Sequence, residues 1–368
     1  MLAIELLDEL VGGTRAAAWP SIRHDLGLSY PEIGLVLAVP GFVGSALDPL
    51  VGVVGDTSRR RLLMVAGGLG FAASAALTAA AGGFWLLLAA LAIGNPATGA
   101  FVSLAQATLM DADPPQRARN MARWTLAGSF GYVGGPVLLA AAVYVGFGWR
   151  GAIAALAAAA LPLTFVALRF PTPPADTAPP LGRALREALA AVRRREVLRL
   201  VLILESADFL LDIFHGFLAL YLVDAAGQTP SVAALGVGVW TGAGLVGDWL
   251  LLPLLRRTTG ARIIRGSALL SLAAYPSFLL VPGLAPKLML LAALGLLNSG
   301  WYAIPKAWLY DALPDRSGAA VAVGGLGGIA GAAVPLALGF LAGSAGIGAT
   351  MWVLLLAPVA LLALTSDR

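Results

Sequence analysis

Ionisable side chains recur at helical spacing near the start of the chain and again 200 residues later. Positions 5, 8, 12 and 15 fall within an arc of about 80°, because a helix turns about 100° per residue. They share one face, which carries Glu5, Asp8, Gly12 and Arg15 in the first copy and Glu205, Asp208, Asp212 and His215 in the second. Such a face is suited to carrying protons, binding cations or pairing with a charged group of a substrate.

The carboxyl groups of this face allow a functional and a structural interpretation. Asp8 and Asp208 are candidates for proton carrying or cation binding, or for a structural ion pair between helices. A carboxyl group in a low-dielectric cavity beside a like charge holds its proton more tightly, which is what a proton-coupled carrier requires. Asp212, whose counterpart is Gly12, lies near the middle of its helix and is a candidate for the same role.

The remaining members of the face also have two interpretations. Arg15 either binds a carboxylate or an anionic substrate group, or extends outward to the lipid headgroups. His215 is either a proton relay or a structural hydrogen-bonding group. Glu5 and Glu205 lie closer to the predicted cytoplasmic ends, where they either take part in coupling or are solvated at a helix N-terminus.

These residues belong to a chain that otherwise carries little charge. Of its 368 residues 59% are hydrophobic and 12% are charged, and the mean hydropathy is +0.86. Soluble domains have about 45–50% apolar and about 25% charged residues, so soluble enzymes and nucleic-acid binders are excluded. The chain has no cysteine, which excludes disulfides and thiolate metal sites. Because phosphate-binding and hydrolase motifs are also missing, we expect no enzyme activity, cofactor or metal.

The apolar pattern predicts an all-α membrane protein with twelve transmembrane helices, each of about 20 residues. We expect two six-helix bundles, 1–170 and 197–368, joined by a cytoplasmic linker at 171–196 that ends in an amphipathic helix. The predicted spans are 2–21, 32–54, 61–81, 84–109, 121–145, 149–169, 197–222, 231–254, 262–281, 287–310, 318–343 and 346–365.

The basic residues predict the orientation in the membrane. With the N-terminus inside, most of the 24 Lys and Arg residues fall on the cytoplasmic side. We therefore expect a multi-pass protein of the bacterial inner membrane with both termini in the cytoplasm.

The two halves match beyond their acidic faces. Gly44 and Asp48 recur as Gly244 and Asp248, and further pairs are Asp111 and Asp311, Pro114 and Pro314, Gly128 and Gly328, and Gly131 and Gly331. A duplicated unit of this kind is typical of secondary transporters, with the substrate site between the repeats. Asp48 and Asp248 are expected on helices two and eight, which favours a role in gating over substrate contact.

Two segments resemble motifs of the major facilitator superfamily. The loop after the second span is similar to G-x-L-x-D-R-x-G-R-R, and the fifth span is similar to the antiporter motif G-x-x-x-G-P-x-x-G-G. The matching residues are Gly52, Asp56, Arg60 and Arg61 in the loop and Gly131, Gly135 and Pro136 in the span; Thr57, Arg59, Leu139 and Ala140 depart from the patterns. The resemblance implies the major facilitator fold and a role for Asp56 in locking the cytoplasmic side.

Pro20 and the segment 25–30 are more narrowly similar to the fosmidomycin-resistance group of drug exporters. We therefore expect a monomeric secondary transporter that works by alternating access in the lipid bilayer and exchanges protons for a small amphipathic molecule or drug.

One alternative is a carrier of cations or lysolipids whose acids contact the substrate itself. A membrane receptor or scaffold is disfavoured, because each acid at the bilayer centre costs at least about 2.5–3.5 kcal/mol without serving such a protein.

Overall fold

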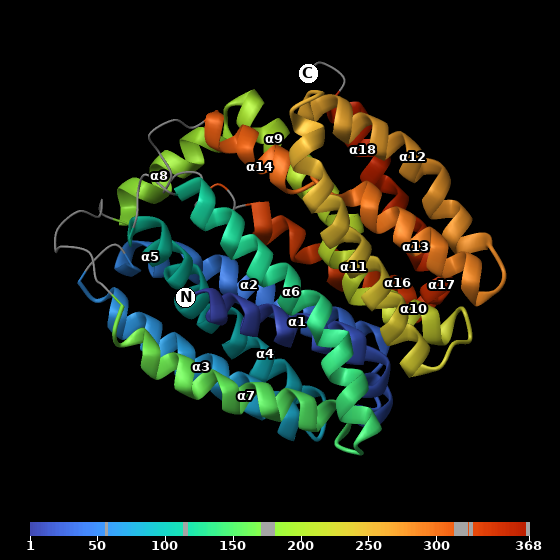
Figure 1. Cartoon of the computed structure of the whole chain (residues 1–368), viewed down its shortest axis with the longest axis horizontal. Helices are drawn as coiled ribbons and strands as arrows, with labels where there is room; N and C mark the ends of the chain where they lie inside the picture. Colours follow the sequence, from blue (N-terminus) through green and yellow to red (C-terminus); the bar gives the residue numbers. More distant parts are fainter. Residues whose placement is uncertain (56–57, 113–116, 171–180, 313–322, 324–326, 366–368) are drawn as a thin grey trace. The chain divides into compact units, whose positions relative to one another are not determined.

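The computed structural model describes residues 1–55, 58–112, 117–170, 181–312, 323 and 327–365. All regular secondary structure in these residues is helical (Figure 1). By its internal contacts the chain divides into two compact units, Met1–Arg186 and Glu187–Arg368. The predicted linker begins at residue 171, and its first ten residues, 171–180, lie outside the described part of the chain.

Unit 1 is a bundle of helices. Its elements are α1 (Leu2–Leu26), α2 (Tyr30–Gly55), α3 (Arg60–Ala80), α4 (Phe84–Thr98), the π-helical segment η1 (Gly99–Ser103), α5 (Leu104–Ala112), α6 (Arg117–Tyr144) and α7 (Gly148–Ala167). Helix α8 (Leu181–Val192) then crosses the boundary between the units.

Unit 2 has the same succession of helices with different interruptions. Its elements are α9 (Arg195–Asp208), the π-helical segment η3 (Phe209–Ile213), α10 (Phe214–Asp224), α11 (Pro230–Leu255), α12 (Gly260–Leu280), α13 (Leu284–Asn298), α14 (Ala303–Asp311), α16 (Ala333–Ala345), α17 (Ile347–Thr350), the 3₁₀ segment η4 (Met351–Leu355) and α18 (Leu356–Leu364). The bounds repeat at an offset of 200 residues: α2 matches α11, α3 matches α12, and α4 matches α13.

Among the described residues, ten helical runs are long and apolar enough to cross a membrane. The two further long runs are the first of each unit, α1 and the run α9–η3–α10, and they carry the acidic faces. Their charged residues set them apart from the ten, since an ordinary span carries few or no charges. The twelve expected spans are thus consistent with ten apolar runs and two acidic ones.

Both units contain a break in their fourth helix. In unit 1 the run α4–η1–α5 changes from α to π geometry at Gly99. In unit 2 the corresponding run opens into a turn between α13 and α14, where Gly300 has a φ of 82°. Positive φ is accessible to glycine at little cost, so this residue permits the turn. The sequence-based span 287–310 missed the break, because its composition remains apolar throughout.

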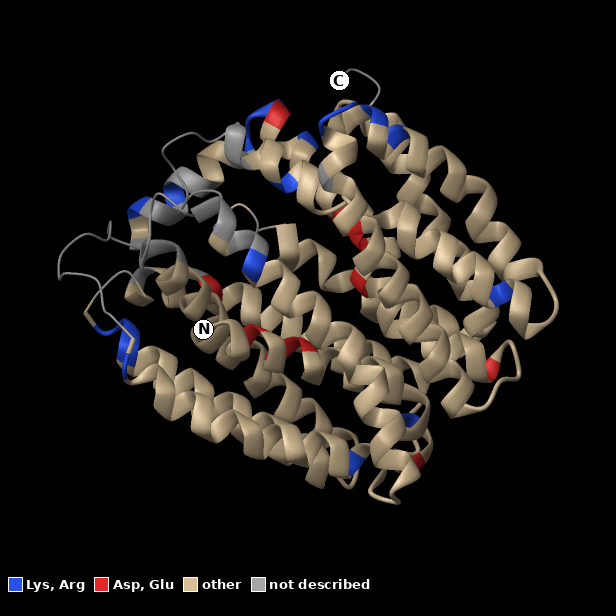
Figure 2. Cartoon of the chain, viewed as in Figure 1, with Lys and Arg blue, Asp and Glu red and all other residues tan. Residues whose placement is uncertain are grey.

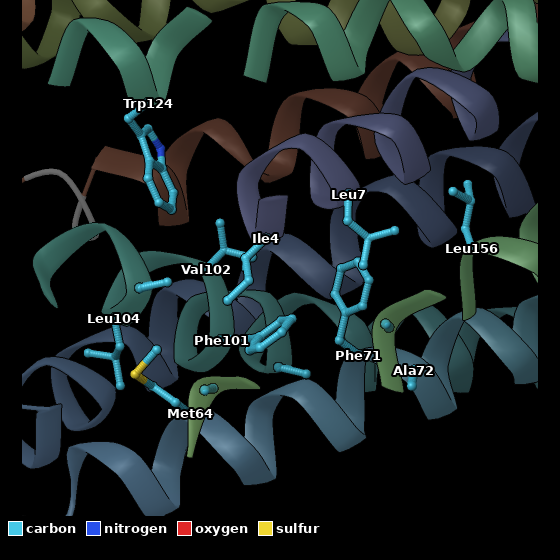
Figure 3. Close-up of a cluster of buried hydrophobic side chains, with 14 residues drawn as sticks. Ile4, Leu7, Met64, Phe71, Ala72, Phe101, Val102, Leu104, Trp124 and Leu156 are labelled. Carbon is cyan, nitrogen blue, oxygen red and sulfur yellow. The ribbon is translucent and has the colours of Figure 1, made fainter. Parts of the chain in front are cut away.

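The core of unit 1 forms where α1 packs among α3, η1, α6 and α7. Figure 3 shows Ile4 and Leu7 of α1 within a cluster that includes Met64, Phe71, Phe101, Trp124 and Leu156. The polar face of α1 therefore belongs to a helix whose other side is fixed by a buried apolar cluster.

A basic side chain caps the same helix end in both units. Arg150 of α7 donates through Nη1 to the carbonyl groups of Ala79 (2.9 Å) and Ala81 (2.6 Å), at the end of α3. Lys287 of α13 donates through Nζ to the carbonyl of Phe278 (2.7 Å), at the end of α12. The last carbonyls of a helix have no partner within the helix, and a cation there also complements the helix dipole. The two units thus cap the same helix end with basic side chains from different helices, a similarity that the amino-acid pattern alone does not reveal.

Replacing Lys287 by Met should lower the midpoint of thermal unfolding, measured by tryptophan fluorescence of the purified protein. Lys287 is only 6% exposed, and its loss leaves the carbonyl of Phe278, at the end of α12, without this donor. A buried polar group without a partner costs about 1–3 kcal/mol. Arg262→Met is the control, because Arg262 is an exposed cation of the same unit. Equal effects of the two substitutions would contradict the capping role.

Candidate functional site

The acidic face of α1 is held by contacts with two neighbouring helices. Thr98, at the end of α4, donates to Asp8 Oδ1 at 3.4 Å. Arg15 interacts electrostatically with Asp8 and Glu9 of its own helix and with Tyr132 of α6. Asp8 and Arg15, predicted to share one face, are therefore brought together by the structure, and both side chains are half-buried.

Glu5, on the same helix, is more deeply buried than Asp8 and Arg15. It is only 8% exposed, and a Cβ atom at Gly128 of α6 would lie 2.6 Å from its Oε1. Trp124, one turn earlier on α6, is a hydrogen-bond partner of the Glu5 carboxylate. Because no side chain at position 128 stands in the way, the carboxylate lies directly against the backbone of α6.

The two motif glycines of α6 allow it to approach α1 closely. A Cβ atom at Gly131 would overlap the backbone carbonyl of Leu6, and one at Gly135 would overlap the backbone nitrogen of Thr14. Thr14 Oγ1 in turn donates to the carbonyl of Gly135 at 3.2 Å. Small residues at such positions bring helix backbones together in membranes. Pro136 is buried beside them within α6.

In unit 2 the acidic face carries three carboxyl groups. Asp208 interacts electrostatically with Asp212 and Glu205, both of its own charge. Glu205 is in turn attracted by Lys306 of α14. The Glu205 carboxylate packs against Gly327 and Gly331, so a Cβ atom at Gly327 would lie 2.7 Å from Glu205 Oε1. Glu5 and Glu205 therefore have similar settings: Glu5 lies against Gly128, and Glu205 lies against Gly327 and Gly331 of its own unit.

The π-helical segment η3 ends between Asp212 and His215. Asp212 lies within η3 and its side chain is exposed, whereas His215 follows in α10 and is only 4% exposed. The His215 ring packs on Trp240 of α11, with centroids 5.5 Å apart. A π turn contains one more residue than an α turn, so later side chains are rotated by about 100° relative to an unbroken helix. The expected single face of four residues therefore does not extend to His215.

Asp48 of α2 and Asp248 of α11 each contact the break in the fourth helix of their own unit. A Cβ atom at Gly99, the first residue of η1, would lie 3.0 Å from Asp48 Oδ1. Asp248, whose side chain is exposed, accepts a hydrogen bond from the backbone of Gly300, in the turn between α13 and α14. Each carboxylate thus meets backbone where the regular helical hydrogen-bonding pattern changes.

The charged loop motif is only partly described. Asp56 lies outside the described residues, and a Cβ atom at Gly52 would meet nothing within 4 Å. Arg60 is 3% exposed and donates through Nε to the carbonyl of Gly55 at 2.5 Å, at the end of α2. Arg61 donates to the carbonyl of Phe170 at 3.0 Å. Both arginines therefore fix chain segments within unit 1.

Charge is distributed unevenly along the helices. Figure 2 shows acidic residues within helical runs of each unit, while Lys and Arg gather mostly at helix ends and connections. Within the described part of the chain, no group of three or more His, Cys, Asp and Glu residues has an arrangement that could hold a metal ion.

Comparison with known proteins gives a family and a fold. The sequence model of the Major Facilitator Superfamily matches residues 10–323. None of the curated proteins compared with the sequence matches it.

Two solved transporter structures are similar over almost the whole chain. A bacterial homologue of the human lysosomal transporter Spinster, inward-facing and unoccupied, has a TM-score of 0.78 and 15% identity, covering 99% of this chain and 94% of that chain. The nucleoside transporter NupG has a TM-score of 0.77 and 14% identity, covering 99% of this chain and 98% of that chain. At these identities the likeness concerns the fold alone.

Gly135→Ala should destabilise unit 1, because its Cβ would meet the backbone of α1 and push α6 away from the acidic face. Overpacking of this kind costs about 1–3 kcal/mol. Gly134→Ala is the matched control, since a Cβ there would meet only the end of the flexible Leu10 side chain at 3.0 Å. Thermal unfolding of both variants tests the prediction, which fails if Gly135→Ala unfolds no earlier than Gly134→Ala.

Proposed function

The chain belongs to the major facilitator superfamily, and on this premise we propose that it is a proton-coupled exporter of a small amphipathic molecule. The observation that carries the proposal is the placement of five carboxyl groups on the first helices of the two units: Glu5, Asp8, Glu205, Asp208 and Asp212. Ionisable groups inside a membrane span are costly and mark substrate or proton pathways. A secondary transporter can use such groups to carry protons or bind substrate, whereas a purely structural helix bundle gains nothing from them.

The two units offer different surroundings to their acids. In unit 1 the permanent cation Arg15 accompanies Asp8. In unit 2 Asp208 faces Asp212 and Glu205, and neighbouring carboxyl groups titrate as a coupled system that is relieved by taking up a proton. We therefore assign the exchangeable proton to Asp208 and Asp212, and a supporting electrostatic role to Asp8 and Arg15.

The transport cycle would follow alternating access, in which the polar interior opens to one side of the membrane at a time. Asp48 and Asp248 are suited to gating, because each carboxylate meets the break in the fourth helix of its unit. A bacterial inner-membrane location, cytoplasmic termini and a monomeric state complete the proposal. The similarity of Pro20 and residues 25–30 to drug exporters supports a drug-like substrate.

A second candidate is a carrier whose acids bind a cationic or lysolipid substrate directly. The observation in its favour is Asp212, whose exposed side chain on η3 is accessible to a substrate group. The likeness of fold to a nucleoside transporter adds nucleosides to the compounds to be tried.

Asp208→Asn and Asp212→Asn should abolish accumulation driven by a pH gradient while leaving substrate exchange at equal pH intact. The measurement is flux into proteoliposomes, screened with drugs, nucleosides, metal ions and lysolipids. Asp224→Asn is the control, because Asp224 is an exposed carboxyl at the end of α10. Undiminished uphill transport in both variants would reject proton coupling through these acids, and loss of exchange as well would favour direct substrate binding.

The proposed orientation has a test of its own, because the chain has no cysteine to label in the background. Ala190→Cys places a single thiol at an exposed position of α8. A membrane-impermeant maleimide should label it in inside-out vesicles and not in intact spheroplasts. The reverse pattern would place this segment outside the cell.

A further inference from the structure

Position 98 and its repeat counterpart, position 298, hold polar residues at the same point of the two units. Thr98 is the last residue of α4 and Asn298 is the last residue of α13. Each is followed at once by the break in the fourth helix, at Gly99 in unit 1 and at Ser299 in unit 2. Neither residue belongs to the motifs or acidic faces that the sequence analysis singled out.

Both side chains reach the acidic helix of their own unit. Thr98 Oγ1 donates to Asp8 Oδ1 at 3.4 Å. Asn298 Nδ2 donates to the backbone carbonyl of Leu210 at 2.9 Å. Leu210 lies in η3 between Asp208 and Asp212, where π geometry has altered the backbone hydrogen bonding. One donor thus acts on the carboxylate itself, and the other acts on the backbone that carries two carboxylates.

Among the described residues, the side-chain amide of Asn298 forms a hydrogen bond through its Nδ2 donor and not through its Oδ1 acceptor. Its side chain is 4% exposed, and its Oδ1 atom has no hydrogen-bond partner among the described residues. A buried amide that leaves its acceptor unsatisfied is costly in a membrane protein. The contact with Leu210 is therefore the interaction that accounts for an amide at this position.

The other side of each break meets the second pair of acids. Gly99, which follows Thr98, lies against Asp48, as the 3.0 Å separation of its hypothetical Cβ from Asp48 Oδ1 indicates. In unit 2 the backbone of Gly300 donates to Asp248, and Ser299 Oγ donates to the carbonyl of Gly244 at 3.1 Å. The break therefore has the acidic first helix on one side and the Asp of the second helix on the other.

We propose that Thr98 and Asn298 are positioning residues that tie the acids of the first helix to the break in the fourth helix, and through it to Asp48 and Asp248. This inference rests on the proposed function, since it assigns these residues to proton coupling. Through this link a change of charge on Asp8, or on Asp208 and Asp212, alters the backbone segment that meets the gating carboxylates.

The test in unit 1 compares two substitutions of nearly equal size. Thr98→Val keeps the shape and removes the donor, and Thr98→Ser keeps the donor. The charged groups that act on Asp8 are Glu5 and Arg15 of α1, and Arg15 in turn interacts with Glu9 and with Tyr132 of α6; all are unchanged in both variants. Ser74→Ala is the matched control, because it removes a buried donor to α4, the bond from Ser74 Oγ to the carbonyl of Ala90 at 2.7 Å.

The measurement is an infrared titration of the carboxylic-acid band in the reconstituted full-length protein, with Asp8→Asn identifying the part due to Asp8. Thr98→Val should move the midpoint of that part to higher pH by about half a unit or more, because the ionised carboxylate loses a hydrogen bond. Thr98→Ser should restore the original midpoint, and Ser74→Ala should not move it. An unchanged midpoint in Thr98→Val, or an equal shift in Ser74→Ala, would overturn the inference for unit 1.

In unit 2, Asn298→Leu removes the donor, and Asn298→Thr installs the residue type found at position 98. The charged groups around Asp208 are Asp212 and Glu205, with Lys306 beside Glu205. The Asp208→Asn variant identifies the part of the carboxylic-acid band that is due to Asp208. The titration midpoint of that part should differ from wild type in Asn298→Leu and should equal the wild-type midpoint in Asn298→Thr. Equal titrations of wild type and Asn298→Leu would overturn the assignment of Asn298.

Valine is almost isosteric with threonine, so Thr98→Val is expected to fold. The inference can therefore be tested in unit 1 even if the Asn298→Leu protein is not produced in folded form. The titration needs no transported substrate. If the Asp→Asn variants keep pH-driven flux, the proposed function fails, while the titration still decides whether Thr98 positions Asp8.

Discussion

A carboxyl group within a membrane span needs a partner other than water, and this requirement accounts for much of the arrangement seen in both units. In the part of the chain that the structure describes, ten helical runs are apolar enough to cross a membrane, and the two acidic runs that begin the units depend on contacts with their neighbours. Glu5 and Glu205 lie against glycine backbone, Asp8 accepts from Thr98, and Asp248 accepts from Gly300. Each contact replaces hydration that the apolar surroundings withhold.

Close approach of helices is what makes these contacts possible. The carboxylate of Glu5 reaches the backbone of α6 only because position 128 has no side chain, and α6 reaches α1 only because Gly131 and Gly135 have none. The glycines of the antiporter-like motif therefore act first on distance between helices. The short distance between α1 and α6 in turn affects the acids, because a wider gap between these helices would separate the Glu5 carboxylate from the backbone of α6.

The two units solve equivalent problems with different residues. The end of the third helix is capped by Arg150 from α7 in unit 1 and by Lys287 from α13 in unit 2. The first helix is continuous in unit 1, whereas η3 interrupts it in unit 2. The fourth helix is π-helical at Gly99 in unit 1 and opens into a turn around Gly300 in unit 2. A duplicated fold thus leaves room for unequal electrostatics, with Arg15 beside an acid in one unit and clustered acids in the other.

Hydropathy and periodicity were sufficient to predict the membrane class, most of the described helices and the repeat, because an apolar span and a 200-residue offset are visible in the linear order. They also brought Asp8 and Arg15 to one face, since an unbroken α-helix has a fixed angle per residue. The same rule failed for His215, because a π segment changes that angle and leaves no mark in the composition. Only the tertiary structure revealed Thr98, Asn298, Arg150 and Lys287, whose roles depend on a carbonyl or carboxylate of another helix rather than on their own neighbours in the sequence.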